Sequence, residues 1–335
     1  MPWTPAAGAW SCPEVAGVRI LIVGAGVIGL SYGWLLSRCH ETTVLARPPR
    51  AEQLRAGVQM RLHRAGGGHR RQPLFGRYLP EVVTAPVDAE LTLVTVDRLH
   101  LHEVLPTVAP LAGRTSLLFM LNHWDIVTQL REWLPREDYV LGFPGQIGGG
   151  RTDAGGDVGI EATLYRHGTR LEADTPAKRA ALDTAVSALT TAGLSVRRER
   201  DMAGWLAVHY LQQSLTLGPL LEAGAYDRLC TDRDALRRMV LALREGVAVC
   251  RARGIVTGGI QPAPLLRLPA RIVAVGLGRM FAQADTRRMV LAHLAHGREE
   301  WRAGFFEVLE AGEHFGVPMP VWDSYAPLVA GGSTR

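Results

Sequence analysis

Short apolar runs alternate with amphipathic segments over the first 200 residues of the chain. Short runs rich in β-branched and other apolar residues are typical of buried parallel strands, and strands are expected at residues 18–23, 42–46, 91–96, 116–121, 139–143 and 194–198. Helical periodicity fills the intervals, up to residue 36 and at residues 101–109, 126–134 and 176–192. This alternation predicts a parallel sheet with helices on both faces, an α/β fold with a Rossmann-type doubly wound sheet.

Two further segments, 157–165 and 169–172, are expected to be strands that run antiparallel to their neighbours. The glycine-rich stretch before them, GGGRTDAGG at 148–156, has the composition of turns.

The pattern changes near residue 200, where strand signals end and helical periodicity takes over. Helices are expected at 202–222, 232–253, 263–282, 287–295 and 298–315. We therefore predict an N-terminal arm (1–17), a nucleotide-binding Rossmann-type domain (18–199) and a C-terminal all-α substrate domain (200–330).

Composition and charge narrow the classes of partner. The chain has 335 residues, 47% of them hydrophobic, and a net charge of +5. Its arginines are spread along the sequence and its only lysine is Lys178, so scattered arginine favours anionic small molecules over nucleic acid. The uncharged run Met202–Leu221 could span a membrane by length, but His209 and two glutamines favour a helix buried in protein.

The four cysteines are widely separated and show no metal-ligand spacing. This pattern indicates neither a disulfide framework nor a metal site, and it favours a reducing compartment. The first residues lack a signal-peptide pattern, so we expect a cytoplasmic protein without membrane partners. A homodimer is one assembly to consider.

A glycine motif follows the first predicted strand, with Gly24, Gly26 and Gly29 spaced as GxGxxG. The first glycine permits a tight turn, the second lets a pyrophosphate approach the backbone, and the third lets helix and strand pack closely. The helix then begins at Val27 and Ile28, whose N–H groups would face the phosphates. Because strand, helix and second strand are all in place, the motif predicts dinucleotide binding.

The residues after the second strand indicate which dinucleotide binds. An acidic residue there would hold the ribose 2′-hydroxyl of NAD, but this chain has LARPPR, with Arg47 and Arg50. Arginine suits a 2′-phosphate, so NADPH is the expected cofactor. The alternative is a pair of solvated surface arginines.

Several segments in order resemble the ketopantoate reductases (2-dehydropantoate 2-reductases). These are VGAGVIGLSYGWLLS, VLARPPRAEQLRAGVQMRL, FMLNHWD, LGFPGQIGGGRTDAGG and GREEWRAGFFEVLEAGEHFGVPMPV. The resemblance implies a Rossmann domain, a helical substrate domain and an active site in the cleft between them. It also implies reduction of a 2-keto acid by NADPH, with a lysine as proton donor.

The family's catalytic positions are poorly matched in this sequence. The helix that corresponds to the family's catalytic helix, WLAVHYLQQSLTLGP, contains no lysine and no asparagine. Lys178 is expected on an exposed face of another helix. Alignment on Gly218-Pro219 places Tyr210 near the lysine position and Ser214 near the first asparagine position, whereas alignment on Trp205 places Ala207 at the lysine position.

Other positions of the family correspond more loosely. A second family lysine, after the strand that ends at Val96, is replaced by Asp97-Arg98, and the resemblance implies that Val96 and Asp97 lie beside the cofactor. Asn122 retains the asparagine of the Gln-Asn-Gly turn beside the nicotinamide. Glu300 takes the place of a substrate-contacting glutamate, and Arg288 or a neighbour that of a serine.

Spacing brings His209, Gln212, Gln213 and Thr216 onto one face of the Trp205–Pro219 helix. His209 is a candidate proton donor near neutral pH, with Gln213 beside it and Tyr210 as a second candidate. The alternative is a core histidine bonded to the glutamines.

Two candidates lie after predicted strands, where such folds place ligands. His123 is a third candidate acid, and its alternative is a residue of a surface loop. Asp97 would orient the cofactor ribose or a substrate amine, and its alternative is a helix cap.

We therefore predict an NADPH-dependent reductase of the ketopantoate reductase type for a small carbonyl or imine substrate in a specialised biosynthetic pathway. Two alternatives stay open: a non-redox enzyme for dehydration, isomerisation or cyclisation on the same fold, and a non-catalytic NADP-sensing protein.

Overall fold

A computed structural model describes residues 17–66, 72–153 and 157–331, and the chain divides into two compact units. Unit 1 comprises Met1–Leu121 and Val127–Met202, and unit 2 comprises Asn122–Ile126 and Ala203–Arg335. The predicted arm lies outside the described residues except for Gly17.

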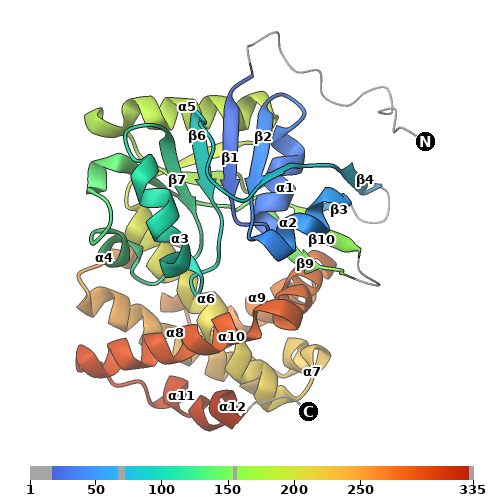
Figure 1. The fold of residues 1–335 in the computed structure, drawn as a ribbon. Helices are drawn as coiled ribbons and strands as arrows, with labels where there is room; N and C mark the ends of the chain where they lie inside the picture. The colour runs from blue at the N-terminus through green and yellow to red at the C-terminus, as the bar shows by residue number, and fades with distance from the viewer. Residues whose placement is uncertain (1–16, 67–71, 154–156, 332–335) are drawn as a thin grey trace. The chain divides into compact units, whose positions relative to one another are not determined.

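Unit 1 is built on an eight-stranded sheet with the order β12-β11-β8-β7-β6-β1-β2-β5 (Figure 1). All its neighbouring strands run parallel except β11, which is antiparallel to β8. The strands are β1 (Arg19–Val23), β2 (Glu41–Leu45), β5 (Glu81–Val83), β6 (Leu91–Val94), β7 (Ser116–Met120), β8 (Tyr139–Phe143), β11 (Thr169–Glu172) and β12 (Val196–Glu199). The predicted Rossmann-type sheet is confirmed.

Helices cover this sheet, with α3 and α5 on opposite sides of it (Figure 1). They are α1 (Val27–Leu36), α2 (Pro48–Arg55), α3 (Leu101–Val108), α4 (Ile126–Leu130) and α5 (Arg179–Thr191), with short turns η2 (Ala109–Leu111), η3 (Arg136–Asp138) and η4 (Pro176–Lys178). Helix α4 ends earlier than the predicted residue 134. Pro135 disfavours helical backbone at the residue before it, and the chain tightens into turns instead.

A second, four-stranded sheet in unit 1 was not predicted. Its order is β4-β3-β10-β9, with β3 (Val58–Arg64), β4 (Leu74–Tyr78), β9 (Ile147–Arg151) and β10 (Val158–Leu164). Helix α1 contacts β1 and β2 of the first sheet and β9 and β10 of the second. This double contact explains why most residues of α1 are buried.

The interpretation of residues 148–151 as turn material was wrong, because they form most of strand β9. β9 pairs antiparallel with β10. A Cβ atom added at Gly149 would lie 2.4 Å from the Cα of Ala162, so glycine is required by the close approach of the two strands.

Unit 2 is helical, as predicted. Its helices are α6 (Met202–Ala223), α7 (Tyr226–Thr231), α8 (Arg233–Ala252), α9 (Ala270–Phe281), α10 (Ala284–His314), α11 (Pro320–Asp323) and α12 (Ala326–Gly331), with turns η5 (Thr257–Gly259) and η6 (Leu265–Arg267). Among the described residues, no helix is long and apolar enough to cross a membrane.

Three helix predictions in unit 2 need correction. The short helix α7 was missed. Helix α9 begins at Ala270, later than the predicted residue 263, because Pro269 precedes it and the prolines at 262 and 264 interrupt the periodicity. The two helices expected on either side of Gly297 run on as α10, with a kink at that glycine (φ −117°, ψ 17°).

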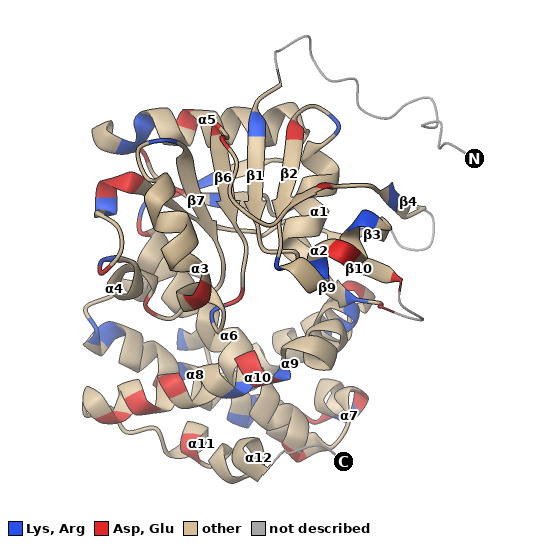
Figure 2. Cartoon of the chain, viewed as in Figure 1, with Lys and Arg blue, Asp and Glu red and all other residues tan. Residues whose placement is uncertain are grey.

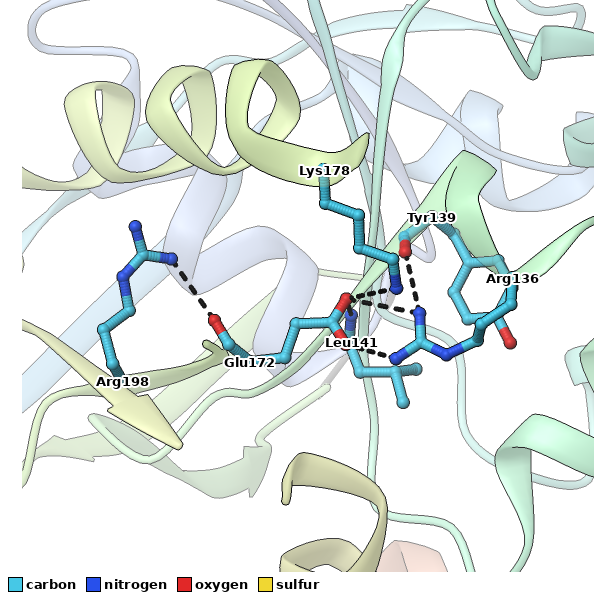
Figure 3. A network of polar contacts seen from close by, with 6 residues as sticks. All are labelled: Arg136, Tyr139, Leu141, Glu172, Lys178 and Arg198. Atoms are coloured by element: carbon cyan, nitrogen blue, oxygen red, sulfur yellow. Dashed lines mark hydrogen bonds and ion pairs between the residues drawn. The ribbon is translucent and has the colours of Figure 1, made fainter. Parts of the chain in front are cut away.

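The prediction that Lys178 is exposed was also wrong. Its side chain is buried in unit 1, where Nζ lies 2.9 Å from Oε1 of Glu172 and 5.3 Å from the ring centroid of Tyr139 (Figure 3). The same carboxylate accepts from Arg136 and, at 3.1 Å, from the backbone N–H of Leu141. The ammonium of Lys178 is buried because it pairs with the buried carboxylate of Glu172 on β11, and the apolar stem of the lysine packs in the core.

The state of the cysteines differs in part from the expectation, and charged residues of both signs occur in both units. Cys39 is disulfide-bonded, contrary to the expectation from the scattered cysteines, whereas Cys230 and Cys250 are free thiols. Basic and acidic residues are interspersed on the helices and strands of both units (Figure 2).

Candidate functional site

The glycine turn between β1 and α1 has the backbone that the motif requires. Gly24 has a positive φ of 118°, which favours glycine. A Cβ atom added at Gly29 would lie only 1.9 Å from the carbonyl oxygen of Gly24. These two positions therefore need glycine for the fold itself, independently of any ligand.

Gly26 differs from both, because a Cβ atom added there would meet nothing within 4 Å. Its backbone is extended (φ −95°, ψ −167°), and it is the N-cap of α1 with no side-chain cap. The first helical hydrogen bond runs from Leu30 N–H to the Gly26 oxygen at 3.0 Å. The N–H groups of Val27, Ile28 and Gly29 precede that bond, so they have no intrahelical acceptor and suit an anion.

The end of β6 supports this turn. Thr95 is buried, and its hydroxyl donates to the carbonyl oxygens of Val23 (3.2 Å) and Gly24 (3.1 Å). The backbone nitrogen of Val96 would lie 2.9 Å from a Cβ atom added at Gly24. Val96 was predicted beside the cofactor, whereas Thr95 was missed because a threonine in an apolar run reads as part of a strand.

The two arginines after β2 lie in different surroundings. Arg47 is highly exposed and lies 3.5 Å from Glu103. Arg50 is largely buried, with Nη1 3.6 Å from Asp153 Oδ2 and 2.9 Å from Gln53 Oε1. Burial lowers the pKa of Arg50, while the carboxylate of Asp153 opposes that shift.

Asp97 is engaged locally. Its Oδ1 accepts from the backbone N–H of His100 at 3.0 Å and lies 2.6 Å from the Nδ1 of the same residue. His100 is the N-cap residue of α3. These bonds stabilise the turn before the helix, but Asp97 is not itself the N-cap residue that the alternative expected.

In unit 2, helix α6 presents the predicted polar face. His209, Gln212 and Gln213 are partly buried, whereas nearly all other positions from Met202 to Pro219 are buried. His209 stacks on Trp205, with ring centroids 4.7 Å apart and an angle of 12°. The amide nitrogen of Gln212 lies 3.3 Å from His209 Nδ1.

Tyr210 points away from that face, as the spacing predicted. It is fully buried, and its hydroxyl donates to Glu307 Oε2 of α10 at 2.7 Å. Ser214, one turn later, is also fully buried, and its Oγ would lie 2.7 Å from a Cβ atom added at Gly304. Both side chains therefore face α10, and Gly304 makes room for them.

The turn after β7 belongs to unit 2 through its contacts. The Nδ2 of Asn122 donates to Gln213 Oε1 of α6 at 2.9 Å. His123 is buried, so the surface-loop alternative for this residue was wrong. Its Nδ1 accepts from the backbone N–H of Asp125 at 3.0 Å. Asn122 and Gln213, which lie far apart in the sequence, are thus in contact.

The two remaining candidates lie on α10. Arg288 forms an ion pair with Asp285 at 3.1 Å, one turn away on the same helix. Glu300 is partly buried just after the kink, and its Oε2 would lie 3.8 Å from a Cβ atom added at Gly297.

Most of unit 1 lies within a match to a known protein family. Residues 20–156 match the model of the family described as ketopantoate reductase PanE/ApbA. The resemblance to the ketopantoate reductases is confirmed over these residues. Among curated protein sequences, none matches this chain.

Solved structures share the fold over nearly the whole chain. D-mandelate dehydrogenase in complex with NADH aligns with a TM-score of 0.71 and 14% identity, covering 93% of this chain and 97% of that one. A PanE/ApbA family ketopantoate reductase from Ralstonia eutropha JMP134 aligns with a TM-score of 0.68 and 20% identity, over 93% and 97%. A probable 2-dehydropantoate 2-reductase from Bacillus subtilis aligns with a TM-score of 0.64 and 17% identity, over 93% and 99%.

These proteins are oxidoreductases by name, and at such identities the likeness to them establishes the fold. Against the ketopantoate reductase pattern, this chain has no lysine on α6, and its only lysine is bound to Glu172 in unit 1. Besides Thr95, sequence reasoning missed Asp153, Glu307 and Arg253, the last of which donates to the carbonyl oxygen of Trp124 at 3.1 Å. Each of them lies far along the chain from the residue it contacts, so no local pattern marks it.

Proposed function

We propose that this protein is an NADPH-dependent reductase of the ketopantoate reductase type that acts on a small carbonyl or imine substrate. The observation that supports it most is the open backbone at Gly26, where an added Cβ atom would occupy free space. Glycine is not needed there for packing or for backbone conformation. Its use at this position is explained by a pyrophosphate that lies close to the backbone.

The residues of unit 1 fit a phosphorylated dinucleotide. The N–H groups at the start of α1 would hold the pyrophosphate, and Thr95 keeps the turn in place. Arg47 and Arg50 would bind the 2′-phosphate, since charge-assisted bonds from arginine to phosphate are strong and specific. Bound there, the reduced cofactor would supply a hydride to the substrate.

In unit 2, His209 would donate a proton to the oxygen or nitrogen of the substrate as the carbonyl or imine is reduced. Stacking on Trp205 fixes the plane of its ring, and the side chain of Gln212 contacts its Nδ1. These two contacts would hold the imidazole in one orientation, as general acid catalysis by its protonated form requires. Tyr210 is less suited because its hydroxyl is buried and donates to Glu307.

The side chains that α6 presents at its partly buried positions are neutral amides and one imidazole. With no lysine on this helix, ketopantoate should be a poor substrate. We therefore favour a substrate that carries its carbonyl or imine without a neighbouring carboxylate. Glu300 and Arg288 of α10 remain proposals for substrate contact.

The test is NADPH oxidation with a panel of small ketones, aldehydes and cyclic imines, including ketopantoate, in the wild type and in His209→Gln. Glutamine keeps a hydrogen-bonding group but cannot deliver a proton to an alkoxide. The variant should lose about 10²–10⁴-fold in rate and still bind NADPH. Unchanged activity with a lower melting temperature would place His209 in the core instead.

The proposal extends to a cytoplasmic homodimer in a specialised biosynthetic pathway. These points rest on the sequence alone. The mass of the protein in solution, measured by light scattering, tests the dimer.

A further inference from the structure

Helix α9 of unit 2 is apolar on two opposite faces. One face packs into the unit through its buried residues, which are Ala274, Gly278 and Phe281. The other face carries Ile272, Val275 and Met280, whose exposed fractions are 55%, 44% and 38%. A surface helix normally turns polar residues toward solvent, so the second face of α9 differs from the usual pattern.

The apolar surface continues into the turn before the helix. Leu265 and Leu268 are 51% and 46% exposed. Arg244 of α8 donates to the carbonyl oxygens of Leu266 (2.8 Å) and Leu268 (2.7 Å), so this turn is held in place. We call the continuous surface the α9 face, which comprises Leu265, Leu268, Ile272, Val275, Gly276, Arg279 and Met280. Exposed apolar residues that are contiguous mark interaction sites, whereas scattered ones do not.

Gly276 lies in the middle of the α9 face. It is exposed and helical, and a Cβ atom added there would meet nothing within 4 Å. Glycine inside a helix is less favourable than alanine, and here neither packing nor backbone conformation requires it. A glycine at such a position is explained by the close approach of another backbone, for which a Cβ atom would leave no room.

The charge around the α9 face has one sign. Residues 246–284 contain five arginines and no aspartate or glutamate. Three of these arginines, Arg267, Arg271 and Arg279, are exposed. Within the part of the chain that the structure describes, no acidic side chain pairs with them. The α9 face is therefore complementary to an apolar surface that carries negative charge.

Two other occupants fit these observations less well. A lipid bilayer with anionic headgroups would satisfy the arginines, but fluid acyl chains do not require a glycine, and the α9 face has no tryptophan or tyrosine for the interface. A second copy of the same face would bring Arg271 and Arg279 of the two copies together, and like charges in an interface oppose association.

We propose that the α9 face binds an acidic α-helix of another protein. Aliphatic side chains of that helix would pack on Ile272, Val275 and Met280, its backbone would approach Gly276, and its carboxylates would pair with the arginines. All residues of the α9 face belong to unit 2, and none is among those proposed to bind NADPH or to donate a proton. The inference is thus independent of the proposed function.

The first test concerns Gly276→Ala. If no part of the chain itself needs this glycine, the variant should melt about 2–4 °C higher than the wild type, because alanine favours the helix. Binding of a fluorescent synthetic helix of about 20 residues, with leucine and alanine on one face and glutamate on the other, should become about tenfold weaker. A lower melting temperature would show that the fold requires the glycine and would overturn the proposal.

The second test concerns charge. The wild type should bind the glutamate peptide and should not bind a matched peptide with lysine in place of glutamate, and added salt should weaken the binding. Arg279→Glu should weaken it about tenfold or more. Arg131→Glu is the control, because it makes the same change of charge at an exposed position of unit 1 and should leave the affinity unchanged.

Three results would overturn the proposal. The first is a wild type that does not bind the glutamate peptide, or binds it as well after Gly276→Ala. The second is binding to phosphatidylglycerol vesicles that is lost in Arg279→Glu and kept in Gly276→Ala, which would assign the α9 face to a membrane surface. The third is a wild-type dimer in sedimentation that Gly276→Ala dissociates, which would assign it to a second copy.

Discussion

The guanidinium of Arg253 lies over the indole of Trp124, with 4.3 Å between its Cζ and the ring centroid. Arg253 also donates to the carbonyl oxygen of Trp124 and lies 3.4 Å from Asp125 Oδ2. Its side chain is only 14% exposed, so these contacts are partly shielded from water. One arginine at the end of α8 therefore anchors the turn that carries Asn122 and His123.

Replacing this arginine should loosen the turn. Arg253→Met keeps the apolar stem but removes the cation–π contact and the bond to the backbone, each of which stabilises by about 1 kcal/mol or more. Backbone amides of residues 122–125 should exchange hydrogen about tenfold faster or more. Arg251→Met is the control, because Arg251 bonds to Thr257 and not to the turn. Equal exchange in the two variants would contradict an anchoring role.

The contact between Asp153 and Arg50 predicts an effect on cofactor preference. Asp153 partly neutralises Arg50, one of the two arginines proposed for the 2′-phosphate. Asp153→Asn should strengthen NADPH binding with little effect on NADH, whereas Arg47→Ala and Arg50→Ala should weaken NADPH by about 1.5–3 kcal/mol. Calorimetry with both cofactors measures the ratio. Equal affinity of the wild type for NADPH and NADH would refute the assignment of the arginines.

The buried carboxylate of Glu172 should be important for stability. Glu172→Gln leaves Arg136 and Lys178 close together without their counter-ion, and breaking a buried ion pair costs about 3–5 kcal/mol. Urea unfolding should show a loss of this order. The matched change Asp88→Asn breaks the exposed pair with Arg114 and should cost at most about 1 kcal/mol. Similar losses for both variants would argue against a special role of the buried cluster.

Cys250 should make stability depend on alkaline pH. Burial raises the pKa of its thiol from the ordinary 9.0 to about 12. Below pH 9 the folded and unfolded chains both keep this proton, so the full stability is present. Between pH 9 and about 12 only the unfolded chain ionises, so stability falls. Between pH 9 and about 12, the free energy of unfolding should decline less steeply in Cys250→Val than in the wild type. Parallel plots of this free energy against pH for the two proteins would rule out a contribution from Cys250.

The sheet of unit 1 and the helices of unit 2 could be predicted because their signals are local. Apolar runs such as residues 18–23 mark strands that are buried on both faces, and the glycine spacing marks the turn before α1. The second sheet could not be predicted, since β9 is rich in glycine and resembles a turn. Its glycines are required by the neighbouring strand β10, which the local sequence does not reveal.

The candidate site, too, could be predicted where its signal is local and could not be predicted where it depends on distant contacts. The polar face of α6 followed from helical spacing, and its partly buried positions agree with it. The partners of Tyr210 and Trp124 did not follow from the sequence, because Glu307 and Arg253 lie 97 and 129 residues from them. Lys178 was misplaced for another reason: Glu172 lies only 6 residues before it, but only the fold turns both side chains into the same buried cluster.

The most direct test of the account is NADPH binding to Gly26→Ala, measured by calorimetry together with the melting temperature. An added Cβ atom meets nothing in the protein, so the fold should be unaffected, but it would occupy the space proposed for the pyrophosphate. We predict an unchanged melting temperature and a loss of NADPH affinity of about tenfold or more. A wild type that fails to bind NADPH, or a variant that binds it as well as the wild type does, would contradict the proposed function.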